Sequence, residues 1–211
     1  MFSFEEIQSA VMAGDMAKVA DLTRQAIEEK VEPAAIINEG YIPAMNVVGK
    51  RFKNGDMFVP EVLMAARSMN TGMELVKPLL VEGEVQAKGT VVLGTVKGDL
   101  HDIGKNLVGM MIESGGYDVI DLGIDLEPEK FVAAVKENKP QIVGMSALLT
   151  TTMLAMKETI ELLKEEGLRD GLKVMIGGAP VSKEFSDEIG ADGYAPDAAS
   201  ATELVEKLIN A

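Results

Sequence analysis

The chain has 211 residues, of which 47% are apolar, so it can bury the core of one large domain or of two small ones. Its 34 acidic and 20 basic side chains give a formal net charge of -14, which repels nucleic acids, and we expect no nucleic-acid partner. The absence of cysteine excludes disulfides, thiolate metal sites and cysteine nucleophiles. The N-terminus lacks the segments of a signal peptide, and no apolar run has the length of a membrane span. We therefore expect a cytoplasmic protein without membrane contact.

Up to residue 80 the sequence has a helical pattern, without the alternation of apolar and polar residues that is typical of strands. Breaks in this pattern predict four to five helices and fall at residues 14–15, 32–33, 54–55 and 59–60. Ser3 and Glu6 have the spacing of a capping box at the start of the first helix. Pro33 fits the first turn of a later helix, where its missing N–H is not needed. These features predict a small helical bundle.

From residue 89 the pattern changes to short apolar runs that alternate with amphipathic segments. The apolar runs predict five strands, at 90–96, 117–123, 141–146, 172–178 and 191–195. The amphipathic segments predict five helices, at 104–114, 128–138, 152–166, 182–189 and 198–210. Strands and helices in alternation form a parallel sheet with helices on both faces. We expect a doubly wound α/β fold of the flavodoxin-like (Rossmann-like) type, with strand order 2-1-3-4-5.

The two patterns predict a helical domain at 1–85 and an α/β domain at 89–211, joined by a polar linker at 81–89. In a doubly wound sheet of this order the ligand crevice lies at the carboxyl ends of strands 1 and 3. The loop after the first strand, KGDLHDIG, contains His101, the only histidine of the chain. The loop after the third strand, SALLTTT at 146–152, is also rich in polar residues. We expect these two loops to face each other across the crevice.

Four interpretations of His101, which lies between Asp99 and Asp102, imply different chemistry. It could simply order a turn. The His-Asp doublet resembles the metal-dependent phosphohydrolases of the HD family, but their metal site needs further histidines that this chain lacks. A receiver-like phosphoacceptor would have an aspartate after strand 3, where Ser146 stands. The fourth interpretation is an axial ligand of a cofactor metal, with Asp99 holding the second ring nitrogen and neighbouring glycines giving a planar ring access to the backbone.

Three motifs occur in order on the expected loops, D-x-H-x-x-G at 99–104, S-x-L at 146–148 and G-G at 177–178. Together they resemble the cobalamin-binding module of cobalamin-dependent methionine synthase and of the small corrinoid proteins of methyl-transfer systems. The segment DMFVPEVLMAARSM at 56–69 is similar to the one by which the helical bundle of that family caps the corrin ring. The resemblance spans essentially the whole chain. It is closest to the free-standing corrinoid proteins of methylamine, methanol, betaine or methoxyarene methyltransferases.

The resemblance implies that the chain binds cobalamin or a related corrinoid, with His101 as the cobalt ligand in place of the cofactor's own base. Asp99 would hydrogen-bond the other ring nitrogen and, together with Thr152, take up or release a proton as cobalt changes oxidation state. Methionine synthase has a serine where this chain has Thr152, whose β-branching restricts its rotamers. The other residues implied to contact the corrinoid from the α/β domain are Gly98, Asp102, Ile103, Gly104, Ser146, Leu148, Thr150, Gly177, Gly178 and Ala198.

The resemblance also assigns a place to each group of residues around the corrin. The loop at 146–150 would line the slot for the displaced base and its nucleotide tail, Gly177 and Gly178 would let that tail lie against the backbone, and Ala198 would close the slot. Above the ring, Phe58 would shield the methyl group, with Val62 one helical turn further on. Phe58 could instead pack in the core of the bundle. A cap must move aside to expose the cobalt, which makes the linker at 81–89 a candidate hinge.

The function implied by the resemblance is that of a methyl carrier, which turns over no substrate alone. A substrate-specific methyltransferase would load the cobalt, and a second methyltransferase would pass the methyl group to tetrahydrofolate or a thiol. A reductive activator would reduce cobalt that has been oxidised to Co(II) back to Co(I). Two alternatives share the histidine motif. A cobalamin-binding mutase subunit would not need a cap with Phe58, and a cobalamin-responsive regulator would need a basic DNA-binding segment, which this acidic sequence does not offer.

Overall fold

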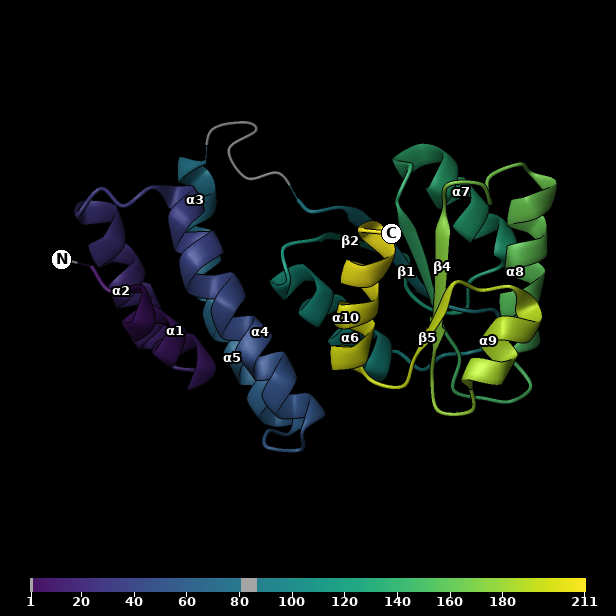
Figure 1. Cartoon of the computed structure of the whole chain (residues 1–211), viewed down its shortest axis with the longest axis horizontal. Coiled ribbons are helices and arrows are strands. Elements are labelled where there is room, and N and C mark those ends of the chain that lie inside the picture. Colours follow the sequence, from purple (N-terminus) through teal and green to yellow (C-terminus); the bar gives the residue numbers. More distant parts are fainter. Residues whose placement is uncertain (1, 81–86) are drawn as a thin grey trace. The chain divides into compact units, whose positions relative to one another are not determined.

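The computed structural model describes residues 2–80 and 87–211, which form two compact units. One unit consists of the N-terminal helices, and the other begins at Lys88 and contains a sheet (Figure 1). The expected linker at 81–89 falls largely outside the described residues. Among the residues that are described, no helix combines the length and the apolarity needed to cross a membrane.

Within residues 2–80 the helical unit contains four main helices, α1 (Phe4–Met12), α2 (Met16–Glu28), α4 (Ile42–Lys53) and α5 (Val59–Val76). Three shorter segments accompany them, α3 (Pro33–Ala35), the π-helical η1 (Ile36–Tyr41) and the 3-10 helix η2 (Lys77–Leu79). The predicted start of the first helix is confirmed, because the Ser3 hydroxyl accepts the backbone N–H of Glu6 at 3.4 Å. Pro33 stands in the first turn of α3, as its missing N–H predicts.

The core of the helical unit contains a buried polar pair, Tyr41 and Thr23. Tyr41, the last residue of η1, is fully buried, and its hydroxyl lies 2.6 Å from Oγ1 of Thr23 in α2. Burial raises the pKa of Tyr41 to about 12, although the hydrogen bond to Thr23 opposes that rise. Gly72 of α5 leaves room for the Tyr41 ring, since a Cβ at this position would lie 2.7 Å from Cζ. The polar pair therefore depends on a glycine in the middle of a helix.

The second unit confirms the predicted doubly wound α/β fold. Its strands are β1 (Thr90–Thr95), β2 (Asp118–Asp121), β3 (Ile142–Ser146), β4 (Lys173–Gly177) and β5 (Gly193–Ala195). They form one parallel sheet in the order β2-β1-β3-β4-β5, which is the predicted order. The helices between and after them are α6 (Ile103–Ser114), α7 (Pro128–Asn138), α8 (Leu154–Glu165), α9 (Lys183–Ile189) and α10 (Ala198–Ile209).

The sheet separates two apolar clusters, because successive residues of a strand point to opposite faces. Val92 packs with Phe131 of α7 and Ile160 of α8. The neighbouring residue Val91 packs instead with Ile112 of α6 and Val205 of α10. Figure 1 shows α6 and α10 on one side of the sheet and α7 and α8 on the other. Both faces are thus covered, which leaves the strand ends and their loops as the surface on which a site can form.

Candidate functional site

The motif-bearing loops all begin at one edge of the sheet. Thr95, Ser146, Gly177 and Ala195 are partners in register, and they are the last residues of β1, β3, β4 and β5. The loops that follow them contain the D-x-H-x-x-G motif, the rest of the S-x-L motif, and the second glycine of the G-G motif. The parallel arrangement therefore brings three motifs, which are distant in sequence, to the same edge.

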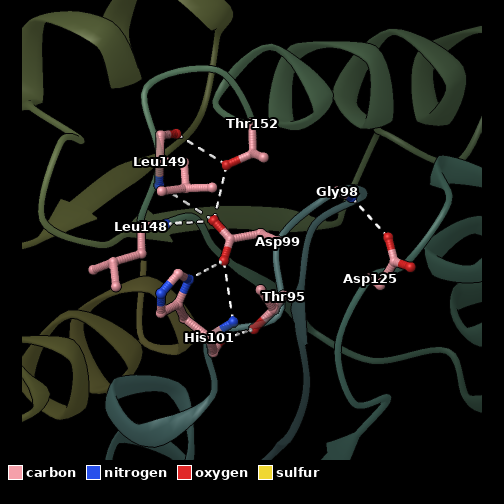
Figure 2. A network of polar contacts seen from close by, with 8 residues as sticks. All are labelled: Thr95, Gly98, Asp99, His101, Asp125, Leu148, Leu149 and Thr152. Carbon is pink, nitrogen blue, oxygen red and sulfur yellow. Dashed lines mark hydrogen bonds and ion pairs between the residues drawn. The ribbon is translucent and has the colours of Figure 1, made fainter.

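His101 is fixed on one side of its ring and open on the other. Its Nδ1 lies 2.7 Å from Oδ1 of Asp99, which also accepts the backbone N–H of His101 at 3.1 Å. The Thr95 hydroxyl donates to the carbonyl of His101 at 2.9 Å, so the backbone is held as well (Figure 2). The side chain is 52% exposed, and within the described residues its Nε2 has no hydrogen-bond partner.

Asp99 is buried, and its second oxygen is held by the loop after β3. Oδ2 accepts the N–H groups of Leu148 at 2.7 Å and Leu149 at 3.3 Å, and the hydroxyl of Thr152 at 2.8 Å. Burial alone would raise the pKa of Asp99, but the bonds from Leu148, His101 and Thr152 outweigh it and hold the pKa well below the ordinary value of a carboxyl. An ionised carboxylate only accepts hydrogen bonds. Nδ1 of His101 is therefore the donor, and the lone pair of the neutral ring lies on Nε2.

Thr152 extends this chain of contacts by one group. Its Oγ1 lies 2.8 Å from Asp99 and 2.9 Å from the carbonyl of Leu149, but the hydroxyl has a single proton to donate. While Asp99 is ionised, that proton can point to the carboxylate. If Asp99 receives a proton, Thr152 can accept from it and donate to Leu149 instead. The restricted rotamer of threonine does not prevent the contact, and a proton can be shared along His101, Asp99 and Thr152.

The two loops that hold this cluster also expose apolar side chains. Ile103 is 80% exposed and is the most exposed of a set that also includes Leu100, Leu148, Leu149 and Leu154. A Cβ built on Gly104 would meet no atom within 4 Å, so the start of α6 is open. Exposed apolar side chains gathered around a polar group are typical of a binding surface rather than of ordinary protein surface. The arrangement fits a large, flat, mostly apolar group with a metal that takes a nitrogen ligand.

The remaining predicted residues of the α/β unit lie at the same edge without joining the His101 cluster directly. Gly98 and Asp102 are exposed, and Asp102 accepts a hydrogen bond from Asn106 at 3.1 Å. Ser146 is half-buried at the end of β3 and Thr150 is exposed in the loop that follows. Ala198 is buried as the first residue of α10.

The two glycines at the end of β4 have a reason to be glycine within the protein itself. Gly178 has φ +123, and a Cβ there would meet the backbone of Ala147. A Cβ on Gly177 would come within 2.9 Å of the carbonyl oxygen of Ala195. The close approach of neighbouring backbone segments therefore requires small residues here, whatever else lies against them.

The predicted cap residues differ in exposure. Phe58 immediately precedes α5 and is 68% exposed, with its backbone N–H donating to Oε2 of Glu61 at 2.8 Å. Val62 is fully buried. Phe58 is thus not a core residue of the helical bundle, which was the alternative explanation for its side chain. Both residues belong to the helical unit, and the hydrogen-bonded cluster around His101 does not include them.

Sequence reasoning missed the contacts of two residues next to the site. Lys105 in α6 is almost completely buried, forms an ion pair with Asp121 at the end of β2, and donates to Oδ1 of Asn106 at 2.7 Å. Asp125, in the loop after β2, accepts the backbone N–H of Gly98 at 2.7 Å. A lysine directly after the D-x-H-x-x-G motif was a signal for the first contact. For the second the sequence offers no periodic pattern, because it joins a side chain to a backbone N–H of another loop.

Two parts of the sequence, residues 89–203 and 3–77, match families described as B12 binding domain. A corrinoid protein of Desulfitobacterium hafniense is 45% identical over 212 residues, which cover 99% of this chain and 98% of the relative. Trimethylamine corrinoid protein 1 of Methanosarcina acetivorans is 43% identical, with 99% and 98% covered. A chain in the crystal structure of the methanol:cobalamin methyltransferase complex from Methanosarcina barkeri has a TM-score of 0.89 at 34% identity, and the match covers 98% of this chain and 79% of that one.

Proposed function

This chain belongs to the corrinoid proteins built from B12 binding domains, and we propose that within this family it is a methyl carrier. The observation that carries the proposal is the presentation of His101. Its Nδ1 donates to a buried aspartate 2.7 Å away, and its Nε2 has no partner among the described residues. A neutral imidazole fixed in this way is a good ligand for a transition metal. When bound, the corrinoid supplies a cobalt centre that accepts a methyl group from one compound and gives it to another.

In this proposal the residues of the chain bind the cofactor and control a proton. His101 would hold the cobalt through Nε2, in place of the cofactor's own base. Asp99 fixes the tautomer of His101, and Thr152 completes a path of three side chains along which a proton can be held. The exposed apolar side chains of the two loops, among them Leu148 and Ile103, give the ring a dry surface.

The other predicted contacts are assigned by the resemblance and by their place at the sheet edge. Gly98, Asp102 and Gly104 lie on the loop and helix start that contain His101. Ser146 and Thr150 are proposed to line the slot for the nucleotide tail. Gly177 ends β4, Gly178 follows it, and Ala198 begins α10. The two glycines are proposed to let the tail lie against the backbone, and Ala198 is proposed to close the slot.

The helical unit is proposed to act as a removable cap. We assign it residues 1–85, and we assign the corrinoid-binding domain residues 89–211. Phe58 is the residue proposed to shield the reactive face, because its ring is mostly exposed and is therefore free to contact a ligand. Val62, which is buried, would support the start of α5 behind it. A cap of this kind keeps water and oxidants away while no partner is bound.

The proposed partners follow from what a carrier must do. One methyltransferase recognises the methyl donor and loads the cobalt, and a second moves the methyl group to tetrahydrofolate or a thiol. The names of the relatives refer to trimethylamine and to methanol, which favours a small methylated compound as the donor. A reductive activator would return oxidised cobalt to the reactive state. We place the exchange in the cytoplasm, where such enzymes and their reductants occur together.

The test uses the fact that His101 is the only histidine of the chain. Protein labelled with 15N-histidine is loaded with hydroxocobalamin, desalted and reduced to Co(II), and its EPR spectrum is compared with that of unlabelled protein. Ligation by His101 predicts that the nitrogen splitting changes from a triplet to a doublet, because the ligating nitrogen is then 15N instead of 14N. No other labelled nitrogen ligand exists. His101→Ala should remove this signal and weaken corrinoid retention.

Two results would contradict the proposal. A wild-type protein that retains no cobalt does not bind the cofactor under these conditions. A labelled protein whose splitting remains a triplet holds the cobalt through the cofactor's base, and His101 then orders a turn without being a ligand. Thr202→Ala is a matched control variant, because Thr202 lies on α10 and bonds only its own helix at Ala198. Its spectrum should equal that of the wild type.

A further inference from the structure

The chain that follows β2 runs alongside the end of β1 and beyond it. The N–H of Leu122 donates to the carbonyl of Leu93 at 2.8 Å. The N–H of Thr95 donates to the carbonyl of Gly123 at 3.0 Å, and the N–H of Leu126 returns to the carbonyl of Thr95 at 3.1 Å. This segment, residues 122–126, is called the bracing segment below. It reaches the loop of His101 from the side opposite to the loop that follows β3.

Asp125 is the residue of the bracing segment that forms hydrogen bonds with the loop of His101. Its backbone N–H donates to the carbonyl of Asp99 at 3.0 Å, and its Oδ1 accepts the N–H of Gly98 at 2.7 Å. Asp125 thereby contacts two consecutive residues of the loop, one through its backbone and one through its side chain. In Figure 2, Asp125 reaches Gly98 from one side while Thr152 and the N–H groups of Leu148 and Leu149 reach the Asp99 carboxylate from the other.

The conformation of Asp125 is one that a side chain rarely adopts. Its φ is +53, in the left-handed region, where residues other than glycine are strained and aspartate and asparagine are the most tolerant. Such a conformation persists only where the surrounding contacts determine it. Here those contacts are the two hydrogen bonds to the loop of His101.

The two neighbouring loops therefore hold different parts of Asp99. The loop after β3 holds its carboxylate, and the bracing segment holds its backbone and that of Gly98 before it. Gly98 itself has φ +79, so without these bonds its backbone would be free to take many conformations. The direction of the Asp99 side chain, and with it the position of the His101 ring, depends on how this stretch of backbone is oriented.

We propose that Asp125 is a positioning residue for the ligand His101. Through its carboxylate it fixes the backbone at Gly98 and Asp99, so that the imidazole is already in place before a corrinoid binds. Among the described residues, Asp125 bonds the backbone of Gly98 and Asp99, and the ring of His101 bonds Asp99 instead. The inference rests on the proposed role of His101 as cobalt ligand, but the ordering of the loop by Asp125 can be measured without any cofactor.

The experiment compares three full-length variants that separate the side-chain bond from charge and from backbone strain. Asp125→Asn keeps an oxygen acceptor and tolerates the left-handed conformation, but loses the charge. Asp125→Gly accepts the conformation without strain but loses the acceptor. Asp118→Asn is the matched control, because it also removes one exposed carboxylate. Asp118 is the first residue of β2, whereas the bracing segment follows the last residue of that strand.

Two readouts are taken on each variant. Amide hydrogen exchange of the cofactor-free protein reports on residues 97–101. For the second readout, each variant is labelled with 15N-histidine and loaded with cobalamin. Its EPR signal gives the ratio of cobalt that is ligated by His101 to cobalt that is not. A net hydrogen bond corresponds to about a 2- to 10-fold change in an equilibrium. Asp125→Gly should increase exchange at Gly98 and decrease the ligated ratio by factors in this range, while Asp125→Asn and Asp118→Asn should match the wild type.

Each other outcome is decisive. If Asp125→Gly matches the wild type in both readouts, Asp125 does not position the loop. If Asp125→Asn loses as much as Asp125→Gly, the carboxylate acts through its charge and the hydrogen-bond argument is wrong. If the loop loosens while the ligated ratio stays unchanged, Asp125 orders the loop without serving ligation, and the inference also fails. A failure of the proposed function is recognised separately, because the wild type then shows no 15N splitting at all.

Discussion

At the scale of single residues, the site is organised around one buried carboxylate. The spacing of Asp99 and His101 predicted their contact, and the resemblance to methionine synthase pointed to Thr152. The structure brings all three together. The sequence could not predict the backbone N–H groups of Leu148 and Leu149 that bind the same carboxylate, because every residue except proline offers such a group. Backbone donors therefore leave no trace in residue identities, and the sequence could not reveal the bond from Leu148, which is the largest of the contributions that lower the pKa of Asp99.

The lowered pKa of Asp99 predicts how the stability of the cofactor-free protein depends on pH. A carboxyl with a folded-state pKa below its unfolded value of about 4 stabilises the protein above that value, and this contribution is lost as the pH falls toward the lower, folded pKa. Asp99→Asn should lower the free energy of unfolding by about 1–3 kcal/mol at neutral pH. The difference from the wild type should shrink below about pH 4, and urea unfolding at a series of pH values measures it.

A difference that stays constant from neutral to acidic pH would contradict this explanation. It would mean that Asp99 stabilises the fold by its shape and neutral hydrogen bonds alone. Asp102→Asn is the control, because Asp102 lies on the same loop but is exposed. Its variant should follow the wild-type curve.

At the scale of elements, the periodicity of the sequence predicted the strands and helices of the α/β unit to within about two residues at most ends. The observed β1 is Thr90–Thr95 against an expected 90–96, and α7 is Pro128–Asn138 as expected. The number of main helices in the first unit was also correct. The π-helical segment Ile36–Tyr41 was missed, because its apolar residues fit an ordinary helix equally well. The extra residue in that turn is a feature of the backbone hydrogen bonds, which the identities of the residues do not encode.

The packing of Tyr41 against α5 predicts an unusual response to substitution of Gly72. Gly→Ala within a helix normally stabilises it by about 1 kcal/mol. At Gly72 the new Cβ would lie 2.7 Å from Cζ of Tyr41, whose hydroxyl is tied to Thr23. Gly72→Ala should therefore destabilise the protein by about 1–3 kcal/mol. Thermal or urea unfolding followed by circular dichroism gives the change.

A double variant identifies the cause. Tyr41→Phe removes the hydroxyl that the new Cβ would meet, so Gly72→Ala should cost less in that background than in the wild type. Gly109→Ala serves as control, since a Cβ in that position of α6 would make only ordinary contacts, 3.5 Å from Leu93 and 3.8 Å from Val119. It should leave stability unchanged or increase it. Equal costs of Gly72→Ala in both backgrounds would rule out the Tyr41 hydroxyl as the cause.

At the scale of the whole molecule, the chain contains one unit with the site and one with the proposed cap. The α/β unit has apolar clusters on both faces of its sheet, and we expect a domain of this size with such a core to fold alone. The hydrogen bonds that fix His101 all come from residues of this unit. Cofactor ligation should therefore not depend on the helices.

Removal of the helical unit tests whether cofactor ligation is independent of the proposed cap. A fragment of residues 88–211 should fold cooperatively, retain one cobalt per chain and give the same EPR splitting from His101 as the full chain. Its reduced cobalt should be oxidised in air severalfold faster, because the proposed shield is gone. The variant Phe58→Ala in the full chain should fall between the two, and Met16→Ala, which truncates another exposed apolar side chain of the same unit, should behave as the wild type. An equal oxidation rate in fragment and full chain would contradict the cap.

The alignment of the strand ends has a consequence for how such a protein can change over evolutionary time. Thr95, Ser146 and Gly177 are partners across the sheet, and each is followed directly by a loop of the site. An insertion or deletion after any one of them alters a single loop and leaves the ladder between the strands intact. A change in the length of one loop therefore need not disturb the sheet, provided that the contacts between the loops at Asp99 are kept. A lineage can acquire a different ligand preference one loop at a time, while the chain continues to fold in the same way.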